Sequence, residues 1–242
     1  MRMLTFAKRN AKEILRDPLN LAFGLGFPLM LILLLTAIQA NIPAALFELE
    51  YLTPGITVFG LSFMTLFSAT IIAKDRGSSL LQRLYTTPLT PADFIWGYAL
   101  PMIPFSTAQC IACYITAAVL GLEVTAGMVC AVACIVPVSI LYIALGLLCG
   151  SVFNDKQVGG ICGALLTNLS AWLSGIWFDL DLVGGTFRKI AYALPFVHAV
   201  ELERAALASD FTGMFPHLWW VLGYTAVLLV LAVVLFLRQM KK

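Results

Sequence analysis

Six long apolar stretches constrain this chain more than any other feature of its sequence. They run over residues 21–40, 52–73, 90–120, 126–153, 158–178 and 218–237. Each is about as long as the roughly 20 apolar residues that a helix needs to cross the hydrocarbon core of a bilayer. Hydrophobic residues make up 61% of the chain and charged ones 12%, which is more apolar surface than a soluble domain can bury. The sequence therefore predicts an all-α polytopic membrane protein with six transmembrane helices, forming one domain over residues 1–242.

The distribution of lysine and arginine predicts the orientation. An even number of spans places both termini on the same side of the membrane. If that side is the cytoplasm, twelve of the fifteen Lys and Arg residues fall in cytoplasmic segments, as the positive-inside rule requires. The other three, Arg188, Lys189 and Arg204, lie in one long outer segment. We therefore expect a multi-pass protein of the cell membrane with both termini in the cytoplasm.

Residues 1–17 have a helical period with two unlike faces. The apolar face holds Met3, Leu4, Ala7, Ala11, Ile14 and Leu15, and the basic face holds Arg2, Lys8, Arg9, Lys12 and Arg16. This pattern is typical of a helix that lies in the membrane interface, here at the inner leaflet, in contact with lipid. A disordered basic tail is the alternative. Asp17 and Pro18 then provide an N-cap and a first-turn proline for the next helix, and Thr90 and Pro91 do so for the third span.

The longest cytoplasmic interruption, residues 74–91, reads KDRGSSLLQRLYTTPLTP. Ser79 and Gln82 have the spacing of a capping box, so a short helix should begin there, and Pro88 should end it. Its apolar side holds Leu80, Leu81, Leu84 and Tyr85, and its polar side holds Ser79, Gln82, Arg83 and Thr86. An amphipathic helix between two spans must lie against lipid head groups or another protein. We interpret it as the contact through which a cytoplasmic motor moves the membrane domain.

The outer segment, residues 179–216, is too long for a simple connection. Two short helical stretches are expected, over 187–194 and 196–208, separated by Pro195. They are compatible with a hairpin that re-enters the outer leaflet, provided that protein or water satisfies the broken backbone.

Two glycine pairs in the later spans, Gly146/Gly150 and Gly159/Gly163, have the spacing that lets membrane helices pack closely. Chance spacing in an apolar chain is an equally good explanation for either pair.

Other chemistries find little support in the sequence. The chain contains no Gly-Lys pair and therefore no phosphate-binding loop, so it lacks ATPase motifs of its own. Ser174 with His198 or His217 suggests an intramembrane protease, but the glycine expected at position 172 is Trp172. No Asp, Glu, Lys, Arg or His lies in the middle of an expected span, whereas ion-coupled carriers usually bury such groups there. A secondary carrier and a membrane-embedded enzyme remain as alternatives.

Several of these residues together resemble a known family. Asp75-Arg76, the run Leu80 to Leu84, Thr87-Pro88 and Gly97 are similar to a pattern in the membrane subunits of type-2 ABC transporter permeases. Leu194-Pro195 with His198 and Arg204 is a second match in the outer segment. Gly77, Ser79 and Tyr98 depart from the pattern, since the family often has glutamate, glycine and a basic residue at these positions.

The resemblance implies a permease subunit of an ATP-driven exporter of hydrophobic or amphipathic substrates, such as a drug, lipid, peptide or glycoconjugate. A coupling helix would dock in a separate ABC ATPase subunit through Asp75, Arg76, Leu80, Leu81, Gln82, Arg83 and Leu84. ATP and Mg²⁺ would bind to that partner, with no cofactor, metal or catalytic residue on this chain and no nucleic-acid partner. A second permease subunit, identical or different, would complete the pathway.

For that pathway the resemblance points to the first, second and fifth spans. The implied lining residues are Phe23, Phe27, Phe63, Phe67, Asn168 and Trp172, and the outer hairpin would contribute Pro195, His198 and Arg204. An aromatic stripe is also typical of ordinary helix packing or lipid contact.

Overall fold

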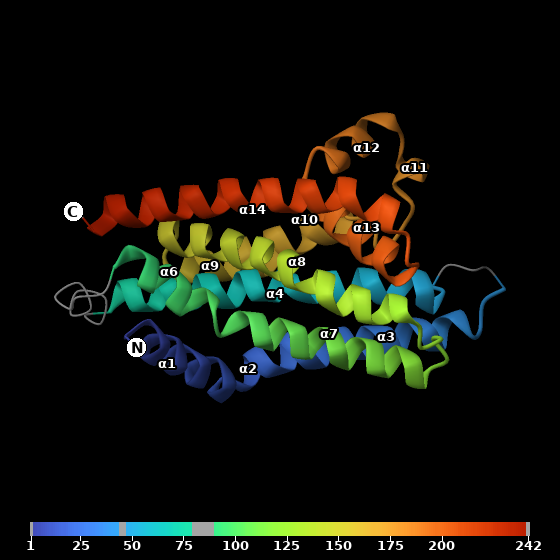
Figure 1. Cartoon of the computed structure of the whole chain (residues 1–242), viewed down its shortest axis with the longest axis horizontal. Helices are drawn as coiled ribbons and strands as arrows, with labels where there is room; N and C mark the ends of the chain where they lie inside the picture. Colours follow the sequence, from blue (N-terminus) through green and yellow to red (C-terminus); the bar gives the residue numbers. More distant parts are fainter. Residues whose placement is uncertain (1, 44–46, 79–89, 241–242) are drawn as a thin grey trace.

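The computed structural model is helical, without a strand, over the residues that it describes, 2–43, 47–78 and 90–240. The predicted all-α class is therefore confirmed. The elements in order are α1 (Arg2–Arg16), α2 (Pro18–Leu21), the π-helix η1 (Ala22–Gly26), α3 (Phe27–Gln39), α4 (Leu49–Gly77), α6 (Pro91–Ala99), α7 (Met102–Val119), α8 (Ala126–Val152), α9 (Asp155–Val158), the π-helix η2 (Gly159–Leu166), α10 (Thr167–Trp172), α11 (Leu180–Val183), α12 (Gly185–Tyr192), α13 (Pro195–Leu207) and α14 (Phe211–Met240). They form an elongated bundle in which α1 begins and α14 ends at the same end (Figure 1).

Within the described residues, five helical stretches are long and apolar enough to cross a membrane: Ala22–Gln39, Leu49–Gly77, Ala92–Val119, Ala126–Val152 and Phe211–Leu235. The expected span over 158–178 is not among them. Its helical run starts with the polar turn of α9, continues through the glycine-rich η2 and stops at Trp172, so this run is less apolar than the five stretches. A multi-pass helical bundle is thus confirmed, but the count of six spans is not.

Helix α4 runs through the centre of the bundle. Of the 18 most apolar consecutive residues of α4, 89% are buried inside the protein. Helices α3, α7, α8 and α13 pack around them. A helix that is apolar on all sides is expected to be enclosed in this way. The other elements are therefore positioned by their contacts with α4.

Helix α8 comes closest to α4 at two glycines. A Cβ atom on Gly146 would overlap Thr65 and Ser68, and one on Gly150 would lie 2.7 Å from the carbonyl oxygen of Ala69. Close packing through the Gly146/Gly150 spacing is therefore confirmed. The Gly159/Gly163 spacing has no such use, because a Cβ atom on Gly159 would meet nothing within 4 Å.

The third span begins as the sequence predicts and is then interrupted. The Thr90 hydroxyl accepts a hydrogen bond from the Asp93 amide at 3.3 Å, and the Asp93 carboxylate accepts one from the Thr90 amide at 2.9 Å. This capping box confirms Thr90 as the N-cap. The sequence predicts one helix from there to about Leu120, but α6 ends at Ala99 and α7 starts at Met102. Pro101 lies at the break, because proline has no amide hydrogen to continue the helix.

The outer segment folds back onto the bundle at the end opposite to α1 (Figure 1). Helices α11 and α12 stand away from the bundle, whereas α13 packs against α14, α8 and α4. Helix α14 starts at Phe211 and contains Pro216. Residues 211–216, which were expected in the outer segment, therefore form the start of the last long helix.

Candidate functional site

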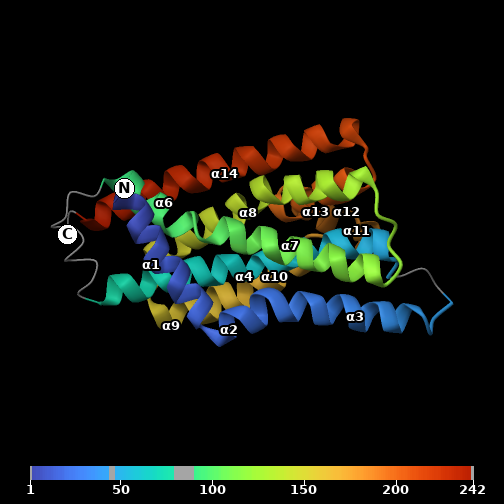
Figure 2. The same cartoon turned by 60° about the horizontal axis from the view of Figure 1, so that its bottom comes forward.

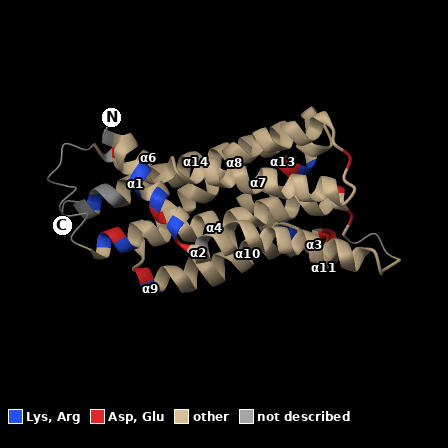
Figure 3. Ribbon diagram, turned by 90° about the horizontal axis from the view of Figure 1, so that it is seen from below, with Lys and Arg blue, Asp and Glu red and all other residues tan. Residues whose placement is uncertain are grey.

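The candidate site lies where α1 meets the ends of α4 and α6. Helix α1 crosses the bundle obliquely at this end (Figure 2), where most of the described Lys and Arg residues also lie (Figure 3). Phe6 of α1 is buried and makes edge-to-face contacts with Phe94, at 5.8 Å between ring centroids, and with Tyr98, at 4.9 Å. These ring contacts hold α1 against α6 and so determine where the polar residues of α1 meet α4.

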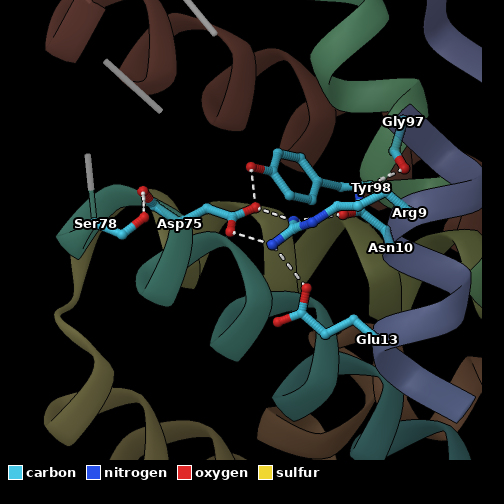
Figure 4. Close-up of polar contacts among 7 residues, drawn as sticks. All are labelled: Arg9, Asn10, Glu13, Asp75, Ser78, Gly97 and Tyr98. Carbon is cyan, nitrogen blue, oxygen red and sulfur yellow. Dashed lines mark hydrogen bonds and ion pairs between the residues drawn. The ribbon is translucent and has the colours of Figure 1, made fainter. Parts of the chain in front are cut away.

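An ion pair connects α1 to the last turn of α4 (Figure 4). Arg9 donates through Nη1 to Oδ2 of Asp75 at 2.6 Å and through Nη2 to Oδ1 at 2.9 Å. The same guanidinium pairs with Glu13, one turn along α1, at 2.8 Å. The Asp75 side chain is 4% exposed and that of Arg9 39%. Two parallel, charge-assisted hydrogen bonds make this one of the stronger and more directional contacts available to a protein.

Helix α6 contributes to the same group of contacts. The Tyr98 hydroxyl donates to Oδ2 of Asp75 at 3.0 Å. The Asn10 amide of α1, fully buried, donates to the carbonyl oxygen of Gly97 at 3.0 Å. A Cβ atom on Gly97 would overlap the Phe6 ring, so glycine at this position is required by the close approach of α1.

These contacts form a unit that we call the α1 clamp: Phe6, Arg9, Asn10, Asp75, Gly97 and Tyr98. Asp75 lies just before the segment that joins α4 to α6, and Gly97 and Tyr98 lie in the helix that follows it. Both ends of that segment are therefore fastened to α1. Arg76 adds a link to α8, since its Nη1 donates to the carbonyl oxygen of Gly150 at 2.8 Å.

At the opposite end, the predicted hairpin residues lie in or beside contacts between α13 and its neighbours. Pro195 starts α13. His198 is buried, with its Nδ1 2.8 Å from Nδ1 of His217 and its Nε2 3.0 Å from the carbonyl oxygen of Tyr192. Its ring stacks on Trp220 at 4.8 Å.

Arg204 connects α13 to α4 and to the turn after α10. Its guanidinium lies 3.4 Å from the centre of the Tyr51 ring, donates to the carbonyl oxygen of Gly175 at 3.1 Å and pairs with Glu201 at 2.8 Å. His198 and Arg204 thus hold α13 against α14, α4 and the turn after α10.

These features were compared with those of known proteins. A family model described as ABC-2 type transporter matches residues 1–208. The chain belongs to the ABC-2 type transporter family. A search among curated proteins gave no match. Proteins of the ABC-2 family are membrane subunits of transporters and are generally not catalytic themselves. The matched residues include the whole α1 clamp and all of α13.

Of the coupling residues predicted for this ABC-2 family member, the structure describes two, Asp75 and Arg76. The predicted Ser79–Gln82 cap and the residues Leu80, Leu81, Gln82, Arg83 and Leu84 lie outside the described residues. On α1, Lys8, Lys12 and Arg16 are exposed, whereas Arg9 is partly buried against Asp75. All four line an open groove of about 820 Å³.

Four of the six residues predicted to line the pathway come together in one aromatic cluster. Phe63 lies 5.8 Å from Phe23, 5.7 Å from Phe27 and 6.4 Å from Phe67 between ring centroids. The cluster extends to three rings that the sequence did not single out, Phe59, Phe105 and Trp177. Phe23 is 46% exposed, whereas Phe63 and Phe67 are buried. Asn168 and Trp172 lie at exposed positions on α10.

The protease alternative finds no support in the geometry. The Ser174 hydroxyl donates to the carbonyl oxygen of Ala171 at 3.1 Å. Both nitrogens of His198 are occupied by His217 and Tyr192, so within the described residues no contact joins this serine to a histidine base.

One ionisable residue of interest escaped the sequence reasoning. Glu203 on α13 is fully buried, and neither carboxyl oxygen has a hydrogen-bond partner within the described residues. Glu203 lies in the outer segment and not in an expected span, so the absence of charges within the spans gave no indication of it. Val200, Glu203 and Ala206 are three residues apart and therefore lie on one side of a helix, which was a sequence signal that Glu203 faces inward with its apolar neighbours. All three are fully buried.

Proposed function

We propose that this chain is the permease subunit of an ATP-driven exporter, working with a separate ABC ATPase subunit and a second permease subunit. The observation that carries the proposal is the α1 clamp. It fastens both ends of residues 74–91, the proposed coupling loop, to a helix that lies along the bundle end rich in Lys and Arg. A push on this loop would therefore move α1, α4 and α6 together instead of bending the loop alone.

The proposed coupling helix within that loop docks in a groove of the ATPase through Leu80, Leu81 and Leu84. ATP and Mg²⁺ bind to the ATPase. Closure of two ATPase subunits pushes the loops of the two permease subunits, and the clamp transmits the displacement to α4. Because α4 is buried at the centre of the bundle, its displacement shifts all the helices that pack on it.

In this proposal the chain crosses the cell membrane six times with both termini in the cytoplasm. The less apolar α9–η2–α10 run makes the fifth crossing, and the outer hairpin over residues 179–216 faces away from the cytoplasm. The exposed Lys8, Lys12 and Arg16 contact anionic lipid at the inner leaflet. A hydrophobic or amphipathic substrate passes along the Phe23, Phe27, Phe63 and Phe67 cluster and leaves beside α13. The second subunit is identical or different.

The partner is tested by co-purification of the tagged full-length chain from its own cells. Leu81→Asp/Leu84→Asp should lower the amount of co-purified ABC ATPase at least a hundredfold. Each buried leucine contributes about 1.5–3 kcal/mol through its removal from water, and each 1.4 kcal/mol is about a factor of ten in affinity. Leu182→Asp, an exposed leucine on α11, is the matched control and should change nothing.

If the double variant inserts normally and retains the ATPase at the wild-type level, the helix lies on lipid head groups and the coupling assignment is wrong. Disappearance of the ATPase from both the double variant and the Leu182→Asp control would mean that the substitutions act through folding. In that case Leu81→Ala/Leu84→Ala, which introduces no charge, decides between the two explanations.

A further inference from the structure

Glu203 is the most unusual polar residue of the described chain. It is fully buried on α13, and both its carboxyl oxygens are without a partner within the described residues. Burial of an unpaired carboxylate is so costly that such a group takes up a proton instead. Removal from water correspondingly raises the pKa of Glu203 well above its ordinary value. The burial comes from helices of this chain alone, so neither a partner subunit nor lipid reaches the side chain in this packing.

The groups around Glu203 provide no cation within the described residues. Cys110 and Tyr114 of α7 and Cys134 of α8 are close enough to interact with it electrostatically. The Tyr114 hydroxyl is itself buried and has no partner there either. These side chains are neutral at physiological pH, and none of them offsets a negative charge.

The ionisable groups that α4 and α14 direct toward α13 are engaged elsewhere. Tyr51 of α4 lies against Arg204, and His217 of α14 lies against His198. The neighbouring Arg204 pairs with Glu201 and binds the carbonyl oxygen of Gly175, because adjacent residues on a helix point in different directions. The nearest arginine in the sequence therefore does not neutralise Glu203.

We propose that Glu203 is a proton-binding site that is protonated while α13 is packed in the bundle and ionised when α13 leaves it. On opening, the carboxyl O–H bond breaks, the proton passes to solvent water, and the electron pair stays on the carboxylate. Opening of the outer helix therefore releases one proton, and protons favour the packed state. This inference depends on the burial of α13 and not on the ATPase, so it stands or falls separately from the proposed function.

The sign of the pH dependence follows from this linkage. Below the ordinary glutamate pKa of about 4.3 both states carry the proton, and pH has no effect through this residue. Above it, packing α13 requires the uptake of one proton. The packed-to-open ratio therefore falls by up to tenfold for each pH unit until the raised pKa of the packed state is reached.

The first measurement is infrared spectroscopy of the purified full-length chain in lipid nanodiscs at pH 7. An ordinary glutamate has lost its proton almost completely at this pH. The wild type should show the carbonyl stretch of a protonated carboxyl group, and Glu203→Gln should lose it. Glu123→Gln, which alters an exposed carboxylate in the α7–α8 connection, should keep it. Absence of the band in the wild type, or its persistence in Glu203→Gln, would overturn the proposal.

The second measurement is amide hydrogen exchange of α13 between pH 5 and pH 8 in the same nanodiscs, with rates divided by the intrinsic exchange rate at each pH. Protection of α13 in the wild type should fall steeply as pH rises, whereas in Glu203→Gln and Glu203→Leu it should lose that dependence. Glu203→Leu also serves if the glutamine variant fails to insert. An equal pH dependence in the wild type and in Glu203→Leu would contradict the proposal.

Discussion

Oδ2 of Asp75 accepts hydrogen bonds both from Arg9, at 2.6 Å, and from Tyr98, at 3.0 Å. These two donors come from α1 and α6, which precede and follow α4 in the chain. A single carboxylate therefore joins three helices of this ABC-2 family member at the segment proposed to meet the ATPase.

Arg9 and Asp75 should not be equivalent when either is neutralised. Arg9→Met leaves a carboxylate that is 4% exposed without its cation, and breaking a buried ion pair in this way costs about 3–5 kcal/mol. Asp75→Asn should lower the free energy of unfolding less, because Arg9 is partly exposed and keeps its ion pair with Glu13. The free energy of unfolding in a denaturing detergent measures both effects, and Lys12→Met should lie within about 0.5 kcal/mol of the wild type. A larger loss of unfolding free energy in Asp75→Asn than in Arg9→Met would contradict the view that an unpaired Asp75 carboxylate is the costlier defect.

Gly97→Ala should weaken the docking of α1 on α6. The added methyl group would overlap the Phe6 ring, and overpacking of this kind typically costs about 1–3 kcal/mol. A smaller side chain should relieve it, so Phe6→Leu combined with Gly97→Ala should recover part of the lost stability. Gly159→Ala, where the new Cβ atom meets nothing within 4 Å, is the matched control. Equal protease resistance of residues 1–17 in Gly97→Ala and the wild type would refute the close contact.

His198 should make the attachment of α13 to α14 sensitive to acid. Burial lowers the pKa of His198, and the neighbouring His217 lowers it further. Because the pKa in the packed state is below the ordinary value of about 6.5, the stabilisation is complete above pH 6.5 and is lost as pH falls below it.

Glu203 has the opposite pH dependence, so the His198 experiment belongs in the Glu203→Gln background. There, the melting temperature should fall from pH 7.5 to pH 5, and adding His198→Gln should reduce that fall. A fall of the same size with and without His198 would assign the acid sensitivity to other groups.

The long elements of the fold were readable from the sequence because each depends on a local pattern. Apolar length predicts α4, α8 and α14, and Thr90 with Pro91 predicts the start of α6. The break at Pro101 and the short α10 were missed, because hydropathy averaged over a span does not register where a helix stops. The last apolar stretch was expected to begin at residue 218, whereas α14 begins at Phe211.

The site was less predictable because its contacts join residues far apart in the chain. Arg9 was assigned to the basic face of an amphipathic helix, and only its approach to Asp75, 66 positions later, shows its partner. Tyr98 counted as a departure from the family pattern, yet it donates to that same carboxylate. Glu203 was overlooked because a helix outside the expected spans packs among them. A short window of neighbouring residues contains neither the Arg9–Asp75 contact nor the packing of α13 among the spans.

The most direct test of the account measures whether the clamp transmits ATP-driven motion. The full-length chain is purified with its ATPase, and hydrogen exchange across α13 is compared with and without ATP and Mg²⁺, for the wild type and for Asp75→Asn. The account predicts an ATP-dependent change in exchange at α13 in the wild type. Asp75→Asn should retain the ATPase and its ATP turnover but lose that change. An ATP response in Asp75→Asn as large as in the wild type, or none in the wild type, would contradict the account.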